Sequence, residues 1–214
     1  MTTLFFGTTG GCLDAFYLFK ELYPDDYDIA FLSDNHDINE KVCGVKIVGG
    51  FNSIKKLKFK NYNFVYQCGS SINHINRNIW FELAVKNGMK PLKLISRFAY
   101  IHETAILGYG SIIYPGVKIM ANVKIGSNCI VLPNTVINHD SSIGDYSIIN
   151  SSCVINGNVN IGSKSFIGSM TSIKERINII SKTTIGMSSV VLSDIQESGV
   201  YYGSPIVKSQ TNKS

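Results

Sequence analysis

The sequence predicts a small α/β domain followed by a parallel β-helix, and three features carry this prediction. Every sixth residue from Ile101 to Val191 is aliphatic, and the residue four places after each of them is small or β-branched. A fixed period of six is typical of a parallel β-helix, in which three six-residue units (hexads) form one triangular coil. The first hundred residues instead show short apolar runs that alternate with helical spacing. The first residues of the hexads are Ile101, Leu107, Ile113, Ile119, Ile125, Val131, Ile137, Ile143, Ile149, Ile155, Ile161, Ile167, Ile173, Ile179, Ile185 and Val191.

The α/β domain is expected to span residues 1–98 and to contain a small parallel sheet of Rossmann type. Apolar runs at residues 3–6, 29–32 and 64–66 predict its strands, and residues 92–95 predict the last one. The first helix should follow Gly11. The second should have Ser70 or Ser71 as its N-cap and end at Gly88. In the first helix, Leu13, Phe16, Tyr17 and Lys20 fall at helical spacing. In the second, the apolar stripe is Ile72, Ile75, Ile79 and Leu83.

The β-helix is expected to span residues 99–196, with about five coils and no long loop between hexads. Each leading residue should lie above the residue eighteen positions further along, so that the interior becomes a continuous aliphatic column. Residues 197–214 leave the period as a C-terminal tail, and residues 210–214 are expected to be disordered.

Composition favours a cytoplasmic protein that handles small ligands. The 214 residues carry a formal net charge of +5, but Lys and Arg are scattered along the chain, which argues against a nucleic-acid partner. A mildly basic surface suits phosphorylated ligands instead. Five cysteines without a CxxC pair predict free thiols in a reducing compartment. The first residues lack the pattern of a signal peptide, and no run nears the ~20 apolar residues that span a bilayer, so no membrane partner is expected.

His139 is the candidate catalytic base. It follows the inward-pointing Ile137 by two residues, and Gly157 stands eighteen residues further along, in the same column one coil away. An imidazole beside an unobstructed backbone N–H suits acyl transfer, because one group removes a proton and the other stabilises an oxyanion. Asp140 could orient the ring or raise its basicity. The alternative interpretation is a surface corner histidine and a glycine that only permits a turn with positive φ.

The other histidines give weaker signals. His102 is expected to be structural, at the junction of the two domains. His74, on the exposed face of a helix, and His36, in a polar loop, are expected to face solvent. Two irregularly spaced histidines in the repeat do not supply the three protein ligands of a catalytic zinc, so no metal is expected.

The turn at residues 7–11, Gly-Thr-Thr-Gly-Gly, joins a predicted strand to a predicted helix, and its free N–H groups and the helix dipole could hold a phosphate. It is not a full GxGxxG motif, and a plain tight turn explains it equally well. Asp34 ends the second strand, where parallel sheets meet a nucleoside. A carboxylate there is also a common helix cap or turn former.

Two stretches resemble a known family: Asn-His-Asp-Ser-Ser-Ile-Gly-Asp at residues 138–145 and Asn-Gly-Asn-Val-Asn-Ile-Gly at residues 156–162. The family is that of left-handed β-helix acyltransferases that acetylate amino-sugar nucleotides, including bacillosamine- and perosamine-type N-acetyltransferases and sialic-acid O-acetyltransferases. The likeness covers essentially the whole chain, and Gly203-Ser204-Pro205 is similar to the family's closing motif. The resemblance implies left-handed coils, a homotrimer with active sites between adjacent prisms, and acetyl-CoA as co-substrate.

By this resemblance His139 is the general base, Asp140 its acidic partner and Gly157 the N–H donor to the thioester carbonyl. Acetyl-CoA is implied to lie toward the C-terminal coils, and the nucleotide diphosphate to bind the N-terminal domain. The implied acetyl-CoA residues are Asn156, Gly157, Ile167, Ile173, Lys174, Gly203 and Pro205, and the implied nucleotide residues are Gly7, Thr8, Thr9, Gly10, Asp34, Cys68 and Gly69. The chain departs from the family at Ile148, where many members carry a second histidine, and at residues 206–208, where Ile-Val-Lys replaces the usual Ala-Lys.

The leading functional hypothesis is acetyl transfer from acetyl-CoA to the 4-amino group of a UDP- or dTDP-linked 4-amino-4,6-dideoxy sugar. O-acetylation of a sugar hydroxyl, as on sialic acid, is the first alternative. A non-catalytic trimeric nucleotide-binding scaffold is the second, and Ile148 favours it. A β-helix sugar-nucleotide pyrophosphorylase would need a larger N-terminal domain, and a γ-class carbonic anhydrase would need three metal-binding histidines.

Overall fold

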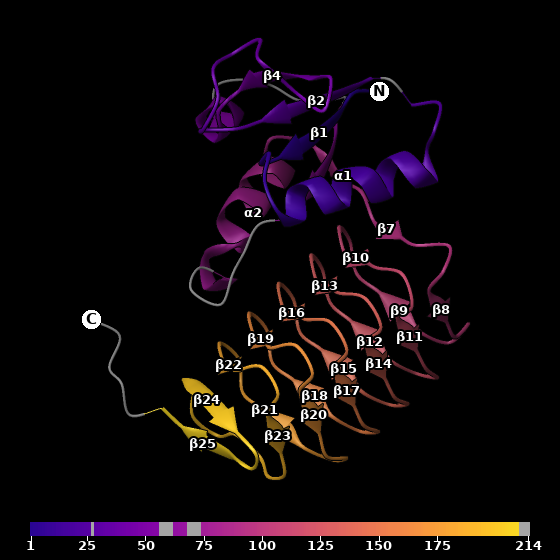
Figure 1. Cartoon of the computed structure of the whole chain (residues 1–214), viewed down its shortest axis with the longest axis vertical. Helices are drawn as coiled ribbons and strands as arrows, with labels where there is room; N and C mark the ends of the chain where they lie inside the picture. The colour runs from indigo at the N-terminus through magenta and orange to yellow at the C-terminus, as the bar shows by residue number, and fades with distance from the viewer. Residues whose placement is uncertain (27, 56–61, 68–73, 210–214) are drawn as a thin grey trace. The chain divides into compact units, whose positions relative to one another are not determined.

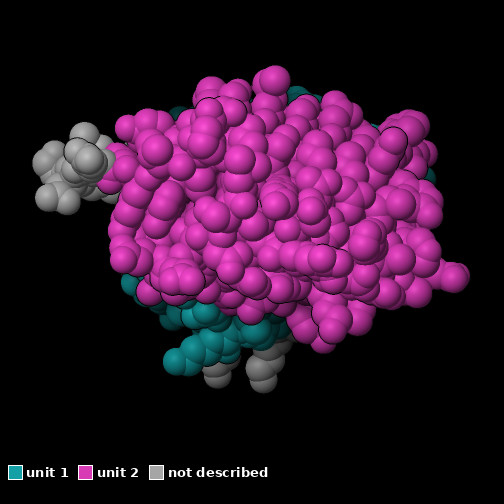
Figure 2. All heavy atoms as spheres, turned by 90° about the horizontal axis from the view of Figure 1, so that it is seen from below, with its two compact units in different colours: residues 1–69, 76–94 teal, residues 70–75, 95–214 magenta. Residues whose placement is uncertain are grey.

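The computed structural model describes residues 1–26, 28–55, 62–67 and 74–209. The chain divides into two compact units, one of residues 1–69 and 76–94 and the other of residues 70–75 and 95–214, which are coloured separately in Figure 2. The first is a small α/β unit and the second is a parallel β-helix (Figure 1). The fold class predicted from the sequence is therefore confirmed.

The sheet of the small unit is built around β1 (Thr3–Phe6), which pairs in parallel with β2 (Ile29–Leu32) on one side and β5 (Asn63–Tyr66) on the other. The full order is β3-β4-β2-β1-β5-β6. Phenylalanines of the sheet and of the first helix form the core, with Phe5 contacting Phe16 and Phe19 edge to face. The remaining elements are α1 (Gly11–Leu22), β3 (Lys41–Val42), β4 (Val45–Gly49), the 3₁₀ helices η1 (Phe51–Lys55) and η2 (His74–Asn76), α2 (Asn78–Lys86) and β6 (Lys90–Pro91).

Three details of this unit differ from the sequence prediction. The hairpin of β3 and β4 was not predicted; its turn uses Cys43 and Gly44, both with positive φ. The second helix begins at Asn78, with Phe81 and Ala84 on its buried side, so the predicted stripe through Ile79 is wrong. Ser70, Ser71 and Ile72 lie outside the described residues. The last strand of this sheet is β6, not residues 92–95.

The β-helix has three sheets, one on each side of its coils, and their strands are parallel except for the last strand of the first sheet. The first contains β7 (Leu94–Ile95), β10 (Ile112–Ile113), β13 (Ile130–Val131), β16 (Ile148–Ile149), β19 (Phe166–Ile167), β22 (Thr184–Ile185), β24 (Val200–Gly203) and β25 (Ile206–Lys208). The second contains β8 (Tyr100–Ile101), β11 (Lys118–Ile119), β14 (Val136–Ile137), β17 (Val154–Ile155), β20 (Ser172–Ile173) and β23 (Val190–Val191). The third contains β9 (Ile106–Leu107), β12 (Lys124–Ile125), β15 (Ser142–Ile143), β18 (Asn160–Ile161) and β21 (Asn178–Ile179).

The register of these sheets confirms the eighteen-residue column. Ile119 pairs with Ile137, and Ile137 pairs with Ile155. The hexad leaders from Ile113 onward are at most 3% exposed, so they fill the interior. Small polar residues beside them bond to the backbone: Ser141 Oγ donates to the carbonyl of Asn156 and accepts from the N–H of Val159, at 2.9 and 3.0 Å. These bonds satisfy polar groups that have no access to water.

The corners of the coils have a fixed backbone conformation. The residue three places after each leader has φ between 48° and 72° at every corner from Gly110 to Ser188. This left-handed region is costly for β-branched residues, and none occurs at these corners; the occupants are Gly, Asn, Asp, Ser, Tyr, Lys, Met and Arg. The corner of interest below is Asp140, with φ 60°.

The segment predicted to be a tail extends the β-helix. Strand β24 pairs in parallel with β22, and β25 folds back antiparallel on β24. Lys208 Nζ, at the end of β25, donates to Oε2 of Glu197, which precedes β24, at 2.5 Å. Residues 210–214 lie outside the described residues.

His74 does not face solvent as predicted. Its side chain is fully buried, and its ring lies 5.6 Å from that of Phe166, both within the β-helix unit. His36 is half-buried and pairs with Glu40 at 3.0 Å. None of the helices in the described part of the chain is long and apolar enough to cross a membrane.

Candidate active site

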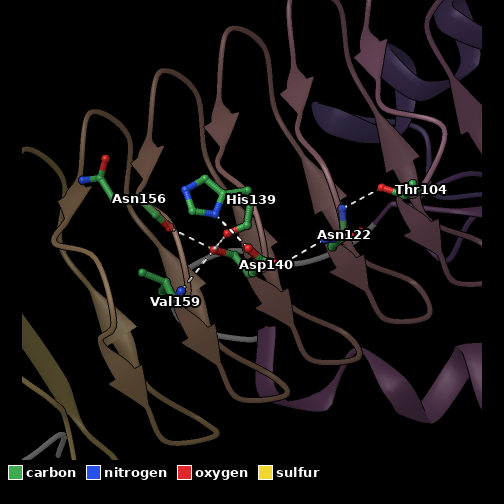
Figure 3. Close-up of polar contacts among 7 residues, drawn as sticks. Thr104, Asn122, His139, Asp140, Asn156 and Val159 are labelled. Carbon is green, nitrogen blue, oxygen red and sulfur yellow. Dashed lines mark hydrogen bonds and ion pairs between the residues drawn. The ribbon is translucent and has the colours of Figure 1, made fainter.

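His139 and Asp140 occupy a corner of the β-helix directly after strand β14. Ile137 ends that strand inside the prism, so the next residues turn outward, and Asp140 adopts the left-handed corner conformation. The side chain of His139 is 61% exposed and that of Asp140 is 45% exposed. The repeat therefore presents an imidazole and a carboxylate side by side on the surface (Figure 3).

Gly157 lies next to this imidazole, one coil further along. A Cβ atom added to Gly157 would lie 2.7 Å from both Cε1 and Nε2 of His139, closer than real contacts allow. Gly157 does not have positive φ; the left-handed residue at its corner is Asn158. The interpretation that Gly157 only permits a turn is therefore wrong. With the ring of His139 in this position, there is no room for a side chain at residue 157.

The backbone N–H of Gly157 is the second chemical group at this corner. Within residues 1–26, 28–55, 62–67 and 74–209, no group accepts a hydrogen bond from it. The same hexad position holds Pro115 and Pro133 in two other coils, and proline has no N–H to contribute. The N–H at this position is thus not needed for hydrogen bonds within the β-helix. Gly157 itself is buried in the single chain, with the ring of His139 against it.

Asp140 fixes the orientation of His139. Nδ1 of His139 lies 2.8 Å from Oδ2 of Asp140, and Oδ1 of Asp140 accepts a hydrogen bond from Nδ2 of Asn122 at 3.0 Å (Figure 3). These two bonds hold the pKa of the Asp140 carboxyl below its ordinary value, with the bond to His139 as the larger cause. An ionised carboxylate can only accept hydrogen bonds, so Nδ1 must be the donor, and we assign the proton of the neutral ring to Nδ1. Nε2 then carries a free lone pair on the side of the ring that meets Gly157.

A groove of about 650 Å³ lies beside this corner, over the third sheet. Asp140, Asn122, Lys124 and Asn160 line it. Further along the same sheet, Ser142, Asn160 and Asn178 form a ladder of side-chain hydrogen bonds of 2.7 and 2.9 Å. This face is polar and open to solvent in the single chain.

The predicted acetyl-CoA residues are only partly placed to meet a ligand. The side chains of Ile167 and Ile173 are fully buried as interior leaders, so only the backbone of these two residues could meet acetyl-CoA. Asn156 is half-buried, and its Nδ2 donates to the carbonyl of Ile173 at 2.8 Å. Lys174 is exposed. Gly203 and Pro205 lie at the turn between β24 and β25.

Ile148, which replaces the second histidine of the resembling family, is 4% exposed in strand β16. It pairs with Ile130 and Phe166 in the first sheet. No second imidazole is therefore supplied from this position.

The turn after β1 offers backbone donors. Within the described residues, the N–H groups of Thr8, Thr9, Gly10 and Gly11 have no acceptor, and they precede the first turn of α1. Such a set of N–H groups at a helix N-terminus is suited to an anion. The side chain of Thr8 is not available, because it is buried and its Oγ1 lies 3.1 Å from Oγ of Ser33.

Asp34 acts as a cap, which was the alternative interpretation of this residue. Its Oδ1 accepts from the N–H of Phe51, the first residue of η1, at 2.9 Å. Oδ2 remains for a second role.

Cys68 and Gly69 lie outside the described residues. Gln67, which the sequence did not single out, is buried at the end of β5 with Nε2 against Gly11.

Among the described residues, no three or more His, Cys, Asp or Glu side chains gather where they could hold a metal ion. The chemical groups of the site are thus an imidazole, a carboxylate and free backbone N–H groups. They can accept a proton, stabilise a negative charge on oxygen, and bind an anion.

The fold and this corner define a class, the two-unit proteins in which a small α/β sheet precedes a hexapeptide-repeat β-helix. Residues 89–200, more than half of the chain, match the family described as the GMPPB C-terminal domain, and the chain belongs to that family. No curated protein sequence matches the chain significantly.

Solved structures with the same fold extend over both units. The acetyltransferase domain of PglB from Neisseria gonorrhoeae FA1090 is 24% identical, with a TM-score of 0.87 over 97% of this chain and 98% of that one. WeeI from Acinetobacter baumannii AYE is 22% identical, with a TM-score of 0.87 over 97% and 99%. PerB from Caulobacter crescentus, solved with CoA and GDP-perosamine, is 21% identical, with a TM-score of 0.84 over 98% and 97%. At these identities the likeness establishes the fold.

Proposed function

We propose that the protein is an acetyl-CoA-dependent N-acetyltransferase that acts on the 4-amino group of a UDP- or dTDP-linked 4-amino-4,6-dideoxy sugar. The observation that carries the proposal is the contact of the His139 ring with Gly157. It sets the exposed imidazole of His139 against the buried backbone of Gly157, whose N–H has no acceptor within the described residues. This pairing is what acyl transfer to an amine requires.

The reaction is a direct transfer. The neutral amine attacks the thioester carbonyl carbon, which forms the C–N bond, and Nε2 of His139 takes the proton that the nitrogen loses. The N–H of Gly157 donates to the oxygen as negative charge develops on it. The C–S bond then breaks, and the sulfur leaves as the CoA thiolate or, after accepting the proton, as the thiol. No acyl-enzyme is needed, because an uncharged amine is already a competent nucleophile.

Asp140 serves this reaction by orientation. Its carboxylate holds Nδ1–H, so that Nε2 is the nitrogen that accepts the proton. It also stabilises the imidazolium that forms as the proton is transferred.

The nucleotide diphosphate is proposed to bind the turn of residues 8–11 through its free N–H groups and the N-terminus of α1. Oδ2 of Asp34 is a candidate acceptor for a ribose hydroxyl, since only Oδ1 is used by the cap. Asn156, Lys174, Gly203 and Pro205 remain the proposed acetyl-CoA residues, and a homotrimer remains the proposed assembly.

The similar structures support this choice of substrates. The acetyltransferase domain of PglB was solved with acetyl coenzyme A. PerB and a variant of perosamine N-acetyltransferase, both from Caulobacter crescentus, were solved with CoA and GDP-perosamine. Both halves of the proposed reaction, a CoA thioester and an amino-sugar nucleotide, appear among them.

The test is a panel of UDP-, dTDP- and GDP-linked 4-amino sugars incubated with acetyl-CoA, with the acetylated product detected by mass spectrometry. Free sialic acid serves as the hydroxyl acceptor. We expect at least one amino-sugar nucleotide to be acetylated on nitrogen and sialic acid to be untouched. If sialic acid alone were acetylated, the acceptor would be a hydroxyl and not an amine. If calorimetry detected no binding of acetyl-CoA at tens of micromolar, the result would favour the alternative of a non-catalytic nucleotide-binding scaffold.

A further inference from the structure

A column of corner residues leads to Asp140 from the preceding coils. Thr104, Asn122 and Asp140 are eighteen residues apart, so they lie at the same corner of consecutive coils. Figure 3 shows their side chains in one line. The contacts are directional: Asn122 Nδ2 donates to Asp140 Oδ1 at 3.0 Å, and the backbone N–H of Asn122 donates to Thr104 Oγ1 at 2.8 Å.

Each oxygen of the Asp140 carboxylate therefore has its own donor. Oδ2 faces Nδ1 of His139, while Oδ1 faces the amide of Asn122. An exposed carboxylate with a single partner can rotate about its Cβ–Cγ bond and exchange its oxygens. A second donor on the opposite side removes that freedom and keeps Oδ2 turned to His139.

Asn122 is itself held in place. Its backbone has the left-handed corner conformation, with φ 60°, and the bond to Thr104 Oγ1 ties its N–H to the coil before. Thr104 Oγ1 also lies 3.0 Å from Nδ1 of His102. The column cannot carry a proton from one end to the other, because its central link runs through a peptide N–H and an amide nitrogen.

We propose that Asn122 is a positioning residue of the acetyl transfer, which orients the Asp140 carboxylate so that His139 keeps its proton on Nδ1 and offers Nε2 as the base. Asn122 acts through Asp140 and touches neither substrate. The inference rests on the proposed function for its effect on turnover, but its effect on Asp140 and His139 does not depend on any substrate.

The variant that tests this is Asn122→Gly. Glycine adopts the corner conformation without strain and already occupies it at Gly110 and Gly116, so only the amide is lost. Asn134→Gly is the matched control, because Asn134 is exposed, has φ 63° and occupies the same hexad position in a different column. Asn122→Asp is a second variant that keeps the shape of the side chain and replaces the donor by an acceptor.

Two measurements on the unliganded protein report positioning directly. Carbon NMR of the Asp140 carboxyl should show its pKa raised in Asn122→Gly, because one of the two hydrogen bonds that lower it is gone, and raised further in Asn122→Asp. Nitrogen NMR of the His139 ring should show that a larger fraction of the neutral ring carries its proton on Nε2 and a smaller fraction on Nδ1. Asn134→Gly should match the wild-type protein in both.

In turnover, Asn122→Gly should lower kcat about 3- to 10-fold relative to Asn134→Gly with the KM for acetyl-CoA unchanged, since the lost bond is charged but exposed. The inference is overturned if the NMR signals of Asn122→Gly and Asn134→Gly coincide, or if their kcat values do. If the NMR signals move as expected while the wild-type protein acetylates nothing in the panel, the proposed function fails and the orientation of Asp140 by Asn122 stands.

Discussion

The imidazole ring of His139 lies against the backbone of Gly157 so closely that a methyl group on Gly157 would come within 2.7 Å of two ring atoms. The two residues are eighteen positions apart, which is one coil of the β-helix. Because this contact brings the candidate base to the candidate oxyanion donor, changes on either side of it should alter catalysis more than folding.

Gly157→Ala should lower kcat about 10²-fold, because the new methyl group pushes the ring away from its position, and small displacements of a catalytic group are costly. The thermal midpoint should change little, since Gly157 has no positive φ and the exposed ring can rotate aside. His139→Ala with Gly157→Ala in one chain is the control: without the ring, any loss of stability caused by Gly157→Ala should disappear. A kcat close to wild type in Gly157→Ala would remove the contact from the mechanism.

His139→Asn should lower kcat on the order of 10²- to 10⁴-fold, the usual contribution of a general base, and leave acetyl-CoA binding measurable by calorimetry. His36→Asn is the matched control, since His36 pairs with Glu40 in the small unit and should keep wild-type turnover. Near-normal turnover of His139→Asn or His139→Ala at neutral pH would mean that the substrate amine loses its proton to another acceptor.

Asp140 should contribute stability above about pH 4 and lose it in acid. The hydrogen bond to His139 lowers the pKa of this carboxyl in the folded protein, so the unfolded chain binds the proton more readily. The contribution is complete above the unfolded pKa and is lost as the pH falls through the lower, folded one. Asp140→Asn keeps a residue that tolerates the left-handed corner. In urea denaturation, the free energy of unfolding of Asp140→Asn should be only slightly lower than that of the wild-type protein, because the carboxylate is exposed. This difference should shrink as the pH falls from 6 to 3. A difference that grows on acidification would contradict this assignment.

Cys43 and Cys153 should differ in reactivity toward thiol reagents. Burial in the β-helix raises the pKa of the Cys153 thiol to about 11, so little thiolate forms at pH 8 and the reagent cannot reach it. Cys43 is exposed in the turn of the β3–β4 hairpin, with Sγ 3.3 Å from the hydroxyl of Tyr17. Peptide mapping after brief alkylation at pH 8 should find Cys43 modified and Cys153 intact. Equal modification of both in folded protein would show that the coil around Cys153 opens.

The β-helix and its site followed from the sequence because they depend on pairing that is local in the repeat. In-register parallel strands set a fixed distance of eighteen residues between stacked positions, so His139 and Gly157 could be matched by counting. The same count leads from Asp140 back to Asn122, a signal that was present in the sequence and was not used. The burial of Ile167 and Ile173 also follows from the repeat, since both are leaders.

The small unit was harder to predict because its decisive contacts join segments that no period relates. Asp34 caps the helix that begins at Phe51, which depends on how the chain between them folds back. The β3–β4 hairpin has no strong turn motif, and its strands are short. His74 is a polar residue that was expected on an exposed helix face, and yet it is buried against Phe166, more than ninety residues away.

The sequence by itself determined the coils, the corners and the column in which His139 meets Gly157, because a repeated hexad permits only one register that buries every leader. Only the tertiary structure decided which nitrogen of His139 is free and which N–H groups lack partners. It also decided that Asn122 holds the second oxygen of Asp140. Those properties depend on hydrogen-bond directions and side-chain rotation, which the spacing of residues does not encode.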